Sequence, residues 1–181
     1  MPIIQIDTRQ KMNKKHHKVK EDYFKKQGFT IVKSKMLVGD FCIPSNGSVV
    51  VDSKQNLQEV YQDLIQDHER FKREADLAVE AGITLYVLIE EPKMKCLEDV
   101  KKWENPRLHR YNKIKYMHRI GKWGHVPEPK GKPPVDNITL YKIMYTFAKK
   151  HGVKWVFCPT EQAGAKILEL LGANNERMEE V

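Results

Sequence analysis

The sequence has no long apolar run and few cysteines. No apolar stretch approaches the roughly 20 residues that a membrane-spanning helix requires, so we expect no membrane contact. The first residues lack the basic start and apolar stretch of a secretory signal. The three cysteines, Cys42, Cys96 and Cys158, are odd in number and widely spaced, which is typical of reduced thiols rather than disulfides. These absences together predict a cytoplasmic protein.

The charge of the chain indicates a polyanionic partner. Its 181 residues are enough for one domain with a substantial core, so we expect a single domain over residues 1–181. Lys and Arg number 32 against 24 Asp and Glu, which gives a net charge of +8. Such an excess favours nucleic acid as the partner, although charge alone does not distinguish DNA from RNA.

Strand and helix patterns alternate along the chain, which is typical of an α/β fold. Strands are predicted over residues 3–7, 29–33, 36–43, 48–54, 83–90 and 153–158. Helices are predicted over residues 14–27, 57–81, 140–150 and 162–171. The pair Asn46-Gly47 predicts a tight hairpin, and therefore some antiparallel pairing in the sheet. The expected architecture is a mixed central sheet flanked by helices.

Two short acidic motifs follow neighbouring strand patterns. Gly39-Asp40 comes first, and Asp52-Ser53-Lys54 follows three valines twelve residues later. Side chains alternate along a strand, so Asp52 and Lys54 are expected to share one face. Two carboxylates that meet at one point repel each other unless a cation lies between them. The pattern therefore predicts a divalent metal held by Asp40 and Asp52, with Lys54 beside it, which suits phosphodiester hydrolysis.

A basic, aromatic segment at about residues 93–135 interrupts the α/β pattern. Residues 93–132 carry twelve Lys and Arg against four Asp and Glu, so this segment alone has a charge of +8. Basic side chains hold phosphates and flat rings stack on unpaired bases. We therefore expect an insertion that binds DNA, and a solvated insertion anchored by its tryptophans is the alternative. The candidate contacts are Lys101, Lys102, Trp103, Arg107, Arg110, Lys113, Lys115, Arg119 and Trp123.

The ordered motifs resemble the PD-(D/E)XK nuclease superfamily, and within it the XPF-type nuclease domain of structure-specific endonucleases. The resemblance is carried by Asp7-Thr8-Arg9-Gln10, by Gly39-Asp40, by Asp52-Ser53-Lys54 and by the helix motif at residues 68–74. It implies a restriction-endonuclease-like core that uses Mg²⁺ or Mn²⁺ to cut branched or partly single-stranded DNA. Short chains of this kind resemble phage-encoded proteins, and pairing through the closing helices implies a possible homodimer.

The resemblance also assigns roles to residues. Asp7, Asp40, Asp52 and Lys54 are the expected catalytic residues, and Asp40 and Asp52 are the metal ligands among them. Arg9 and Arg70 are expected to contact DNA.

Three positions depart from the family pattern. Gln10 stands in place of a glutamate, Gln58 in place of an aspartate, and Ser53 in place of an arginine that would contact phosphate. The missing carboxylate at Gln10 motivates an alternative function, a non-catalytic DNA-binding protein on a degenerate nuclease core. A second alternative is a phage-encoded inhibitor that acts on a host nuclease through protein contacts. No zinc site is expected, because the spacings of His109, His118 and His125 fit no standard ligand pattern.

Overall fold

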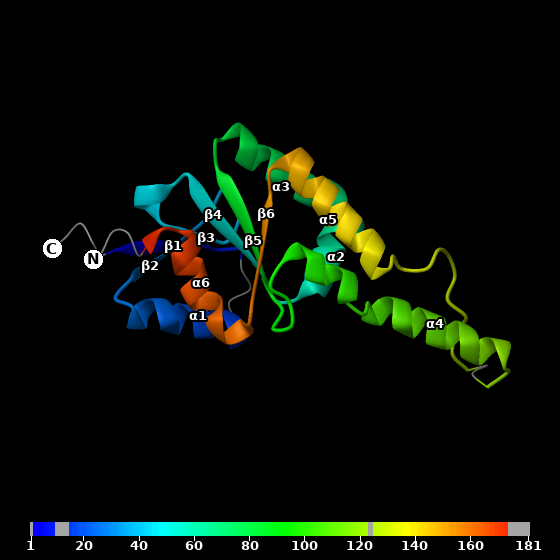
Figure 1. Cartoon of the computed structure of the whole chain (residues 1–181). Coiled ribbons are helices and arrows are strands. Elements are labelled where there is room, and N and C mark those ends of the chain that lie inside the picture. Colours follow the sequence, from blue (N-terminus) through cyan, green and yellow to red (C-terminus); the bar gives the residue numbers. More distant parts are fainter. Residues whose placement is uncertain (1, 10–14, 123–124, 174–181) are drawn as a thin grey trace.

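A computed structural model describes residues 2–9, 15–122 and 125–173, and it places a six-stranded sheet at the centre of the molecule (Figure 1). The strands are β1 (Ile3–Asp7), β2 (Thr30–Ser34), β3 (Phe41–Cys42), β4 (Val49–Lys54), β5 (Thr84–Glu90) and β6 (Lys154–Cys158). Their order across the sheet is β2-β1-β3-β4-β5-β6. Strand β3 pairs antiparallel with both β1 and β4, and the other pairings are parallel. The predicted mixed sheet is therefore confirmed.

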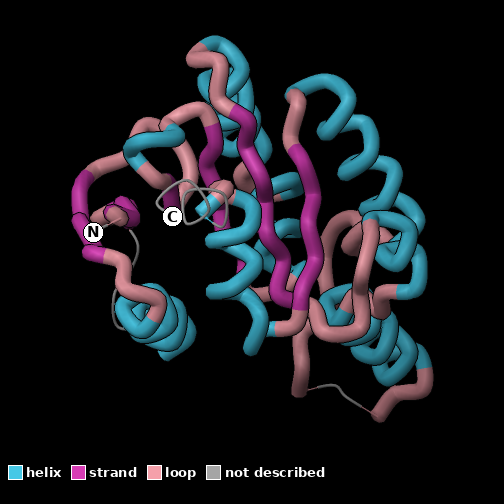
Figure 2. The backbone as a smooth tube through the Cα atoms, turned by 60° about the vertical axis from the view of Figure 1, so that its left-hand side comes forward, coloured by secondary structure: helices cyan, strands magenta, loops and turns pink. Residues whose placement is uncertain are grey.

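Helices cover both faces of this sheet (Figure 2). On one face, α1 (Lys15–Lys26) and α6 (Ala163–Leu170) bury a core that includes Phe24 and Ile167. On the other, α2 (Leu57–Ile65), α3 (His68–Glu80) and α5 (Asn137–His151) bury a second core. In that core the rings of Phe71 and Phe147 stack with their centroids 5.0 Å apart. Sheet and helices together give the α/β class that the sequence predicts.

The long helix predicted over residues 57–81 is wrong, because the chain forms two helices there. Asn56 begins α2 by accepting hydrogen bonds from the backbone N–H groups of Gln58 and Glu59. Asp67 then adopts a non-helical conformation and α3 begins at His68. The apolar stripe is interrupted at this point, because Asp67 and His68 occupy the positions where it would continue after Leu64.

Two expectations about the hairpin region are also wrong. Of the strand predicted over residues 36–43, only Phe41–Cys42 pairs, since Gly39 takes a left-handed conformation just before it. The expected tight turn at Asn46-Gly47 is instead a short 3-10 helix over Pro44–Asn46, and Gly47 has an ordinary φ of −63°. The antiparallel pairing that the turn was expected to produce is nevertheless present between β3 and β4.

The basic segment contains a helix that its weak apolar periodicity does not predict. A 3-10 helix over Leu97–Lys102 comes first, and α4 (Pro106–Arg119) follows it. Asn105 caps α4 by accepting from the N–H of Arg107 at 3.0 Å, and Pro106 occupies its first turn. Figure 1 shows α4 extending away from the sheet. In the described parts of the chain, no helix has the length and apolar character needed to cross a membrane.

Candidate active site

The sheet brings three aspartates into one row. Ile6 pairs with Phe41, and Phe41 pairs with Val51. One residue further along, Asp7 N donates to Asp40 O at 2.9 Å, and Asp40 N donates to Val51 O at 2.9 Å. Paired residues of neighbouring strands point to the same face, so Asp7, Asp40 and Asp52 follow one another across the end of the sheet.

A pocket of about 410 Å³ opens at this edge of the sheet. Among the residues that the structure describes, its lining includes the carboxylates of Asp40, Asp52, Glu59, Asp63 and Asp67 and the cations of Lys54 and Arg70. The structure thus brings together Asp40, Asp52 and Lys54, the three residues on which the sequence prediction depended. Arg70 joins them from α3, at the rim.

Lys54 lies between two acidic side chains. Its Nζ atom is 2.8 Å from Asp52 Oδ2 and 2.8 Å from Asp63 Oδ2, and it lies 5.6 Å from the centre of the Phe71 ring. Burial alone lowers the pKa of Lys54, but the negative charges of Asp52 and Asp63 outweigh burial and leave that pKa above its usual value. Lys54 is therefore a fixed positive charge in the pocket.

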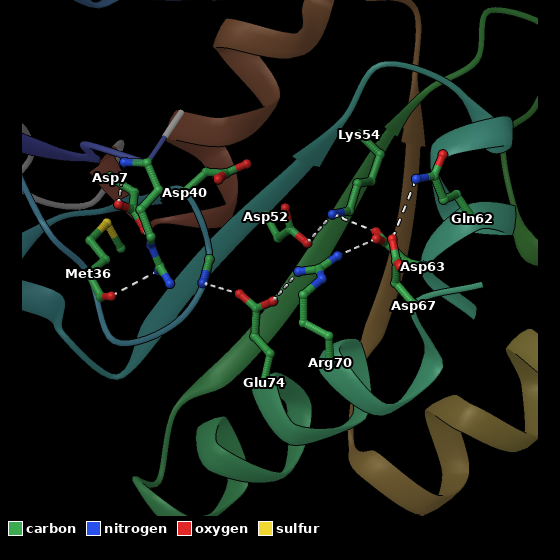
Figure 3. Close-up of polar contacts among 12 residues, drawn as sticks. Asp7, Met36, Asp40, Asp52, Lys54, Gln62, Asp63, Asp67, Arg70 and Glu74 are labelled. Atoms are coloured by element: carbon green, nitrogen blue, oxygen red, sulfur yellow. Dashed lines mark hydrogen bonds and ion pairs between the residues drawn. The ribbon is translucent and has the colours of Figure 1, made fainter. Parts of the chain in front are cut away.

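Asp63 and Glu74 complete a chain of polar contacts around the pocket (Figure 3). The second oxygen of Asp63, Oδ1, accepts from Arg70 Nη2 at 2.5 Å. Arg70 Nη1 lies 3.6 Å from Glu74 Oε2, and Glu74 Oε1 accepts from Gly39 N at 2.9 Å. The chain then returns to the sheet through Asp40, whose Oδ2 accepts from Ser53 N at 2.9 Å. These contacts hold strand β4, helices α2 and α3 and the turn before β3 in place relative to one another.

The turn at Gly39 requires glycine for two reasons. Its φ is +64°, a conformation that residues with a Cβ rarely adopt. A Cβ built there also meets Val50 Cγ1 at 2.3 Å and Val51 O at 3.3 Å. Because Gly39 has no Cβ, its backbone can lie against β4, and this places the neighbouring Asp40 carboxylate close to that strand.

Asp7 is bound by Arg9 and does not line the pocket described above. Asp7 Oδ1 accepts from Arg9 N at 2.8 Å, and Oδ2 accepts from Arg9 Nε at 2.7 Å and also from Nη2. Arg9 Nη2 donates as well to Met36 O at 3.0 Å. Burial raises the pKa of Asp7, but the hydrogen bonds from Arg9 outweigh burial and lower that pKa overall. Asp7 thereby holds the Arg9 side chain, which also contacts the backbone of Met36.

Ser53 faces the opposite side of the sheet from Asp52 and Lys54. Its hydroxyl accepts from Lys20 Nζ at 2.7 Å and donates to Glu90 Oε1 at 3.2 Å, and Lys20 and Glu90 form a buried ion pair. The interpretation that serine here removes a phosphate contact stays a prediction, and the structure adds that the Ser53 hydroxyl is taken up by Lys20 and Glu90. The alternation of side chains along β4 is the signal that predicts this orientation, and Glu90 and Lys20 are partners that the sequence analysis did not identify.

The donor set at the pocket suits a hard divalent cation. Asp52 Oδ2 is buried and, within the described residues, accepts no hydrogen bond with good geometry; its contact is the ammonium of Lys54. Carboxylate oxygens are the ligands that Mg²⁺ and Mn²⁺ prefer. Across the described ranges no group of three or more His, Cys, Asp and Glu side chains is arranged to hold a metal. That Asp40 and Asp52 act as metal ligands stays a prediction, and two protein ligands are usual for a Mg²⁺ ion that keeps several waters.

Several residues of the basic segment have contacts within the protein. Lys101 pairs with Glu98 and lies over the Tyr141 ring, while Lys102 Nζ lies 3.1 Å from Asp99 Oδ1. Trp103 is partly buried and packs against the core. These contacts anchor the start of the segment to the body of the protein.

The α4 residues divide into two groups. Arg107 stacks its guanidinium over the ring of Tyr61, which lies on α2, at 5.4 Å. The other predicted contacts on α4, Arg110, Lys113, Lys115 and Arg119, are exposed. The predicted contact Trp123 falls outside the described residues.

Two solved structures resemble the chain over almost its whole length. XPF from Aeropyrum pernix has a TM-score of 0.56 and 15% sequence identity, over 99% of this chain and 68% of that one. XPF from Aeropyrum pernix in complex with DNA has a TM-score of 0.56 and 13% identity, over 98% of this chain and 66% of that one. The present chain thus spans about two thirds of their length and has an XPF-like nuclease fold. No protein-family model and no curated protein matches the sequence.

Proposed function

We propose that this chain is a metal-dependent DNA endonuclease that hydrolyses phosphodiester bonds in branched or partly single-stranded DNA. The observation that supports it most strongly is the convergence of Asp40, Asp52 and Lys54 in one pocket of an XPF-like fold. Residues from β4 and from the turn before β3 meet there in the arrangement that their spacing predicts. The DNA in one of the similar structures supports the choice of substrate.

Asp40 and Asp52 would hold Mg²⁺ or Mn²⁺. When bound, such an ion polarises a phosphate oxygen and lowers the pKa of bound water. Lys54 is the positive charge beside the reacting phosphate, where it orients the attacking water or stabilises developing negative charge. Asp63 positions the Lys54 ammonium from α2, and Arg70 stands at the pocket rim, where a DNA strand would pass. Asp7 acts through Arg9, whose side chain it positions.

A second candidate function is a non-catalytic DNA-binding protein on the same core. It is favoured by the pairing of Lys54 with Asp52 and Asp63, and by the two hydrogen-bonded oxygens of Asp7. In this arrangement the charge of Lys54 is balanced by two aspartates without a metal. In this case the exposed residues of α4 would carry the function alone.

One experiment separates the two functions. Branched, flapped and single-stranded DNA are incubated with the protein and Mn²⁺, and cleavage and binding are measured in parallel. The endonuclease proposal predicts cleavage of a branched or flapped substrate that Asp52→Ala abolishes while binding persists. If the wild type and Asp52→Ala both bind and neither cuts any DNA tested, the endonuclease proposal is wrong and the binding protein remains.

A further inference from the structure

The helix α4 has an unusual charge pattern for a helix on a protein surface. Its fourteen residues include five Lys and Arg and two His, and they include no Asp or Glu. None of its residues is fully buried. Polar helices are commonly stabilised by pairs of opposite charge three or four residues apart, and α4 contains no acid that forms such a pair. Its charges therefore favour a polyanion outside the helix.

One side of α4 is covered by the chain that returns from it. Tyr111 Oη donates to Gly131 O at 3.2 Å, and the ring of His118 contacts Val126 O. Ile114 lies between these two residues on the helix surface and is partly buried. This side of α4 is consequently covered by the returning chain at Val126 and Gly131, and a partner can approach the remaining surface.

The exposed surface of α4 carries two cationic rows. Arg110 and Lys113 are three residues apart and form one row, and Lys115 and Arg119, four apart, form the other. At 3.6 residues per turn, the two rows lie on opposite flanks of the exposed surface. A flat anionic surface or a single nucleic-acid strand would contact only one of the two cationic rows. A partner that contacts both rows must present phosphates on both sides of the helix.

A third row separates the two flanks. It consists of His109, Asn112 and Tyr116, which follow one another at the three- and four-residue spacing of a helix face and are all exposed. Their imidazole, amide and phenol groups are able to donate to and accept from the edges of bases. This row lies away from Tyr111 and His118, and its Asn112 and Tyr116 line one hollow with Glu128. It would be the leading edge of an inserted helix.

We propose that α4 lies in the major groove of duplex DNA, with one cationic row on the phosphates of each strand. An α-helix with its side chains is about 10–12 Å across, and the major groove is about 12 Å wide, so the groove admits one helix. The phosphates of the two strands border it on both sides, which matches the two rows. The inference deepens the proposed function, on which the choice of DNA as the polyanion rests, and it assigns a duplex arm of the substrate to α4.

The test measures binding without metal, so that cleavage plays no part in it. Fluorescently labelled 20-base-pair duplex and its single strand are titrated in EDTA at several salt concentrations. The variants R110Q/K113Q and K115Q/R119Q each remove one row, and K25Q/K26Q removes two exposed lysines of α1 as a matched control. Each row variant is expected to weaken duplex binding and to reduce the slope of log affinity against log salt by about 1.8, since each phosphate contact contributes about 0.9. The control is expected to change neither quantity.

Two further variants test the geometry. Glu128 lines a hollow together with Lys115 and Arg119, so Glu128→Gln is expected to strengthen duplex binding about two- to five-fold by removing a charge that repels phosphate. Asn112→Ala is expected to weaken duplex binding with an unchanged salt slope, because it contacts bases rather than phosphates. Circular dichroism verifies that each variant retains its helix content.

The inference is overturned if only one row contributes, if single strands bind as tightly as the duplex, or if the α1 control loses as much affinity as the row variants. These results are distinguishable from a failure of the proposed function. A protein that binds duplex through both rows but cuts no DNA refutes the endonuclease and leaves the groove inference standing. If the protein cuts DNA and its row variants bind duplex normally, the groove inference is refuted and the endonuclease proposal stands.

Discussion

The pocket at the end of the sheet and the helix α4 use charge in opposite ways. In the pocket, Lys54 is only 13% exposed and is paired with two aspartates from different elements. On α4, cations lie at the surface of a helix that contains no acid. Buried, paired charges are costly to rearrange, so they fix geometry, whereas exposed charges are screened and adaptable, so they supply affinity. Under the proposed function, the pocket would determine where chemistry takes place and α4 would determine how strongly DNA is held.

The largest effect on stability is expected at Gly39, where the pocket depends on close backbone approach. Gly39→Ala puts a Cβ on a residue in the left-handed conformation and forces that Cβ against Val50. The two effects together are expected to cost about 3 kcal/mol of unfolding free energy. Gly28→Ala is the control, because Gly28 also has a positive φ but a Cβ there meets nothing within 4 Å. Urea unfolding of both variants is the measurement. Equal losses of about 1 kcal/mol in the two variants would mean that the Gly39 turn is not closely packed.

A smaller effect is expected at Asp63, which joins Lys54 to Arg70. Asp63→Asn keeps the shape of the side chain but removes one of the two charges that hold Lys54, so we expect a loss of about 2 kcal/mol in stability. The rate of cleavage is expected to fall by roughly 30-fold with little change in KM, because the ammonium moves while DNA contacts remain. Asp22→Asn, an exposed change on α1, is the control. A rise in KM at constant kcat would show instead that Asp63 contributes to DNA binding.

The smallest effect is expected at Asp7 and appears as a dependence on pH. Since the pKa of Asp7 is lowered in the folded state, its carboxylate contributes stability above the unfolded pKa near 3.8, and this contribution is lost as the pH falls through the folded value. Asp7→Asn should therefore be less stable than the wild type at pH 7, by under about 1 kcal/mol because Arg9 is half exposed. The two stabilities should converge as the pH drops below about 4. Thermal unfolding between pH 2.5 and pH 7 measures this, and parallel curves would contradict the role given to Arg9.

The sequence predicts the sheet and the central trio of the pocket because both depend on local patterns. The alternation of side chains places Asp52 and Lys54 on one face, and the glycine before Asp40 indicates the turn that brings it close. Asp63 and Glu74 were not predicted, because their positions depend on the break between α2 and α3 and on how the two helices pack on the sheet. The packing of two helices on a sheet is a tertiary property, and a short sequence motif does not determine it.

The sequence analysis did not predict α4, although its first turn carries local helix signals. Asn105 and Pro106 are standard signals for the first turn of a helix. The charged residues that follow show no apolar stripe, since this helix packs on little of the protein, and periodicity therefore fails there as a guide. The same absence of an apolar face supports the proposal that α4 is a surface for a charged partner.

The measurement that tests the division between pocket and helix most directly is the single-turnover cleavage rate of one branched DNA, with Mn²⁺, at rising protein concentration. The wild type is expected to cut. The combined variant R110Q/K113Q/K115Q/R119Q is expected to reach the wild-type rate at a higher protein concentration, and Asp52→Asn is expected to reach no measurable rate at any concentration. Cleavage by Asp52→Asn, or a low maximal rate in the α4 variant at saturation, would contradict the account.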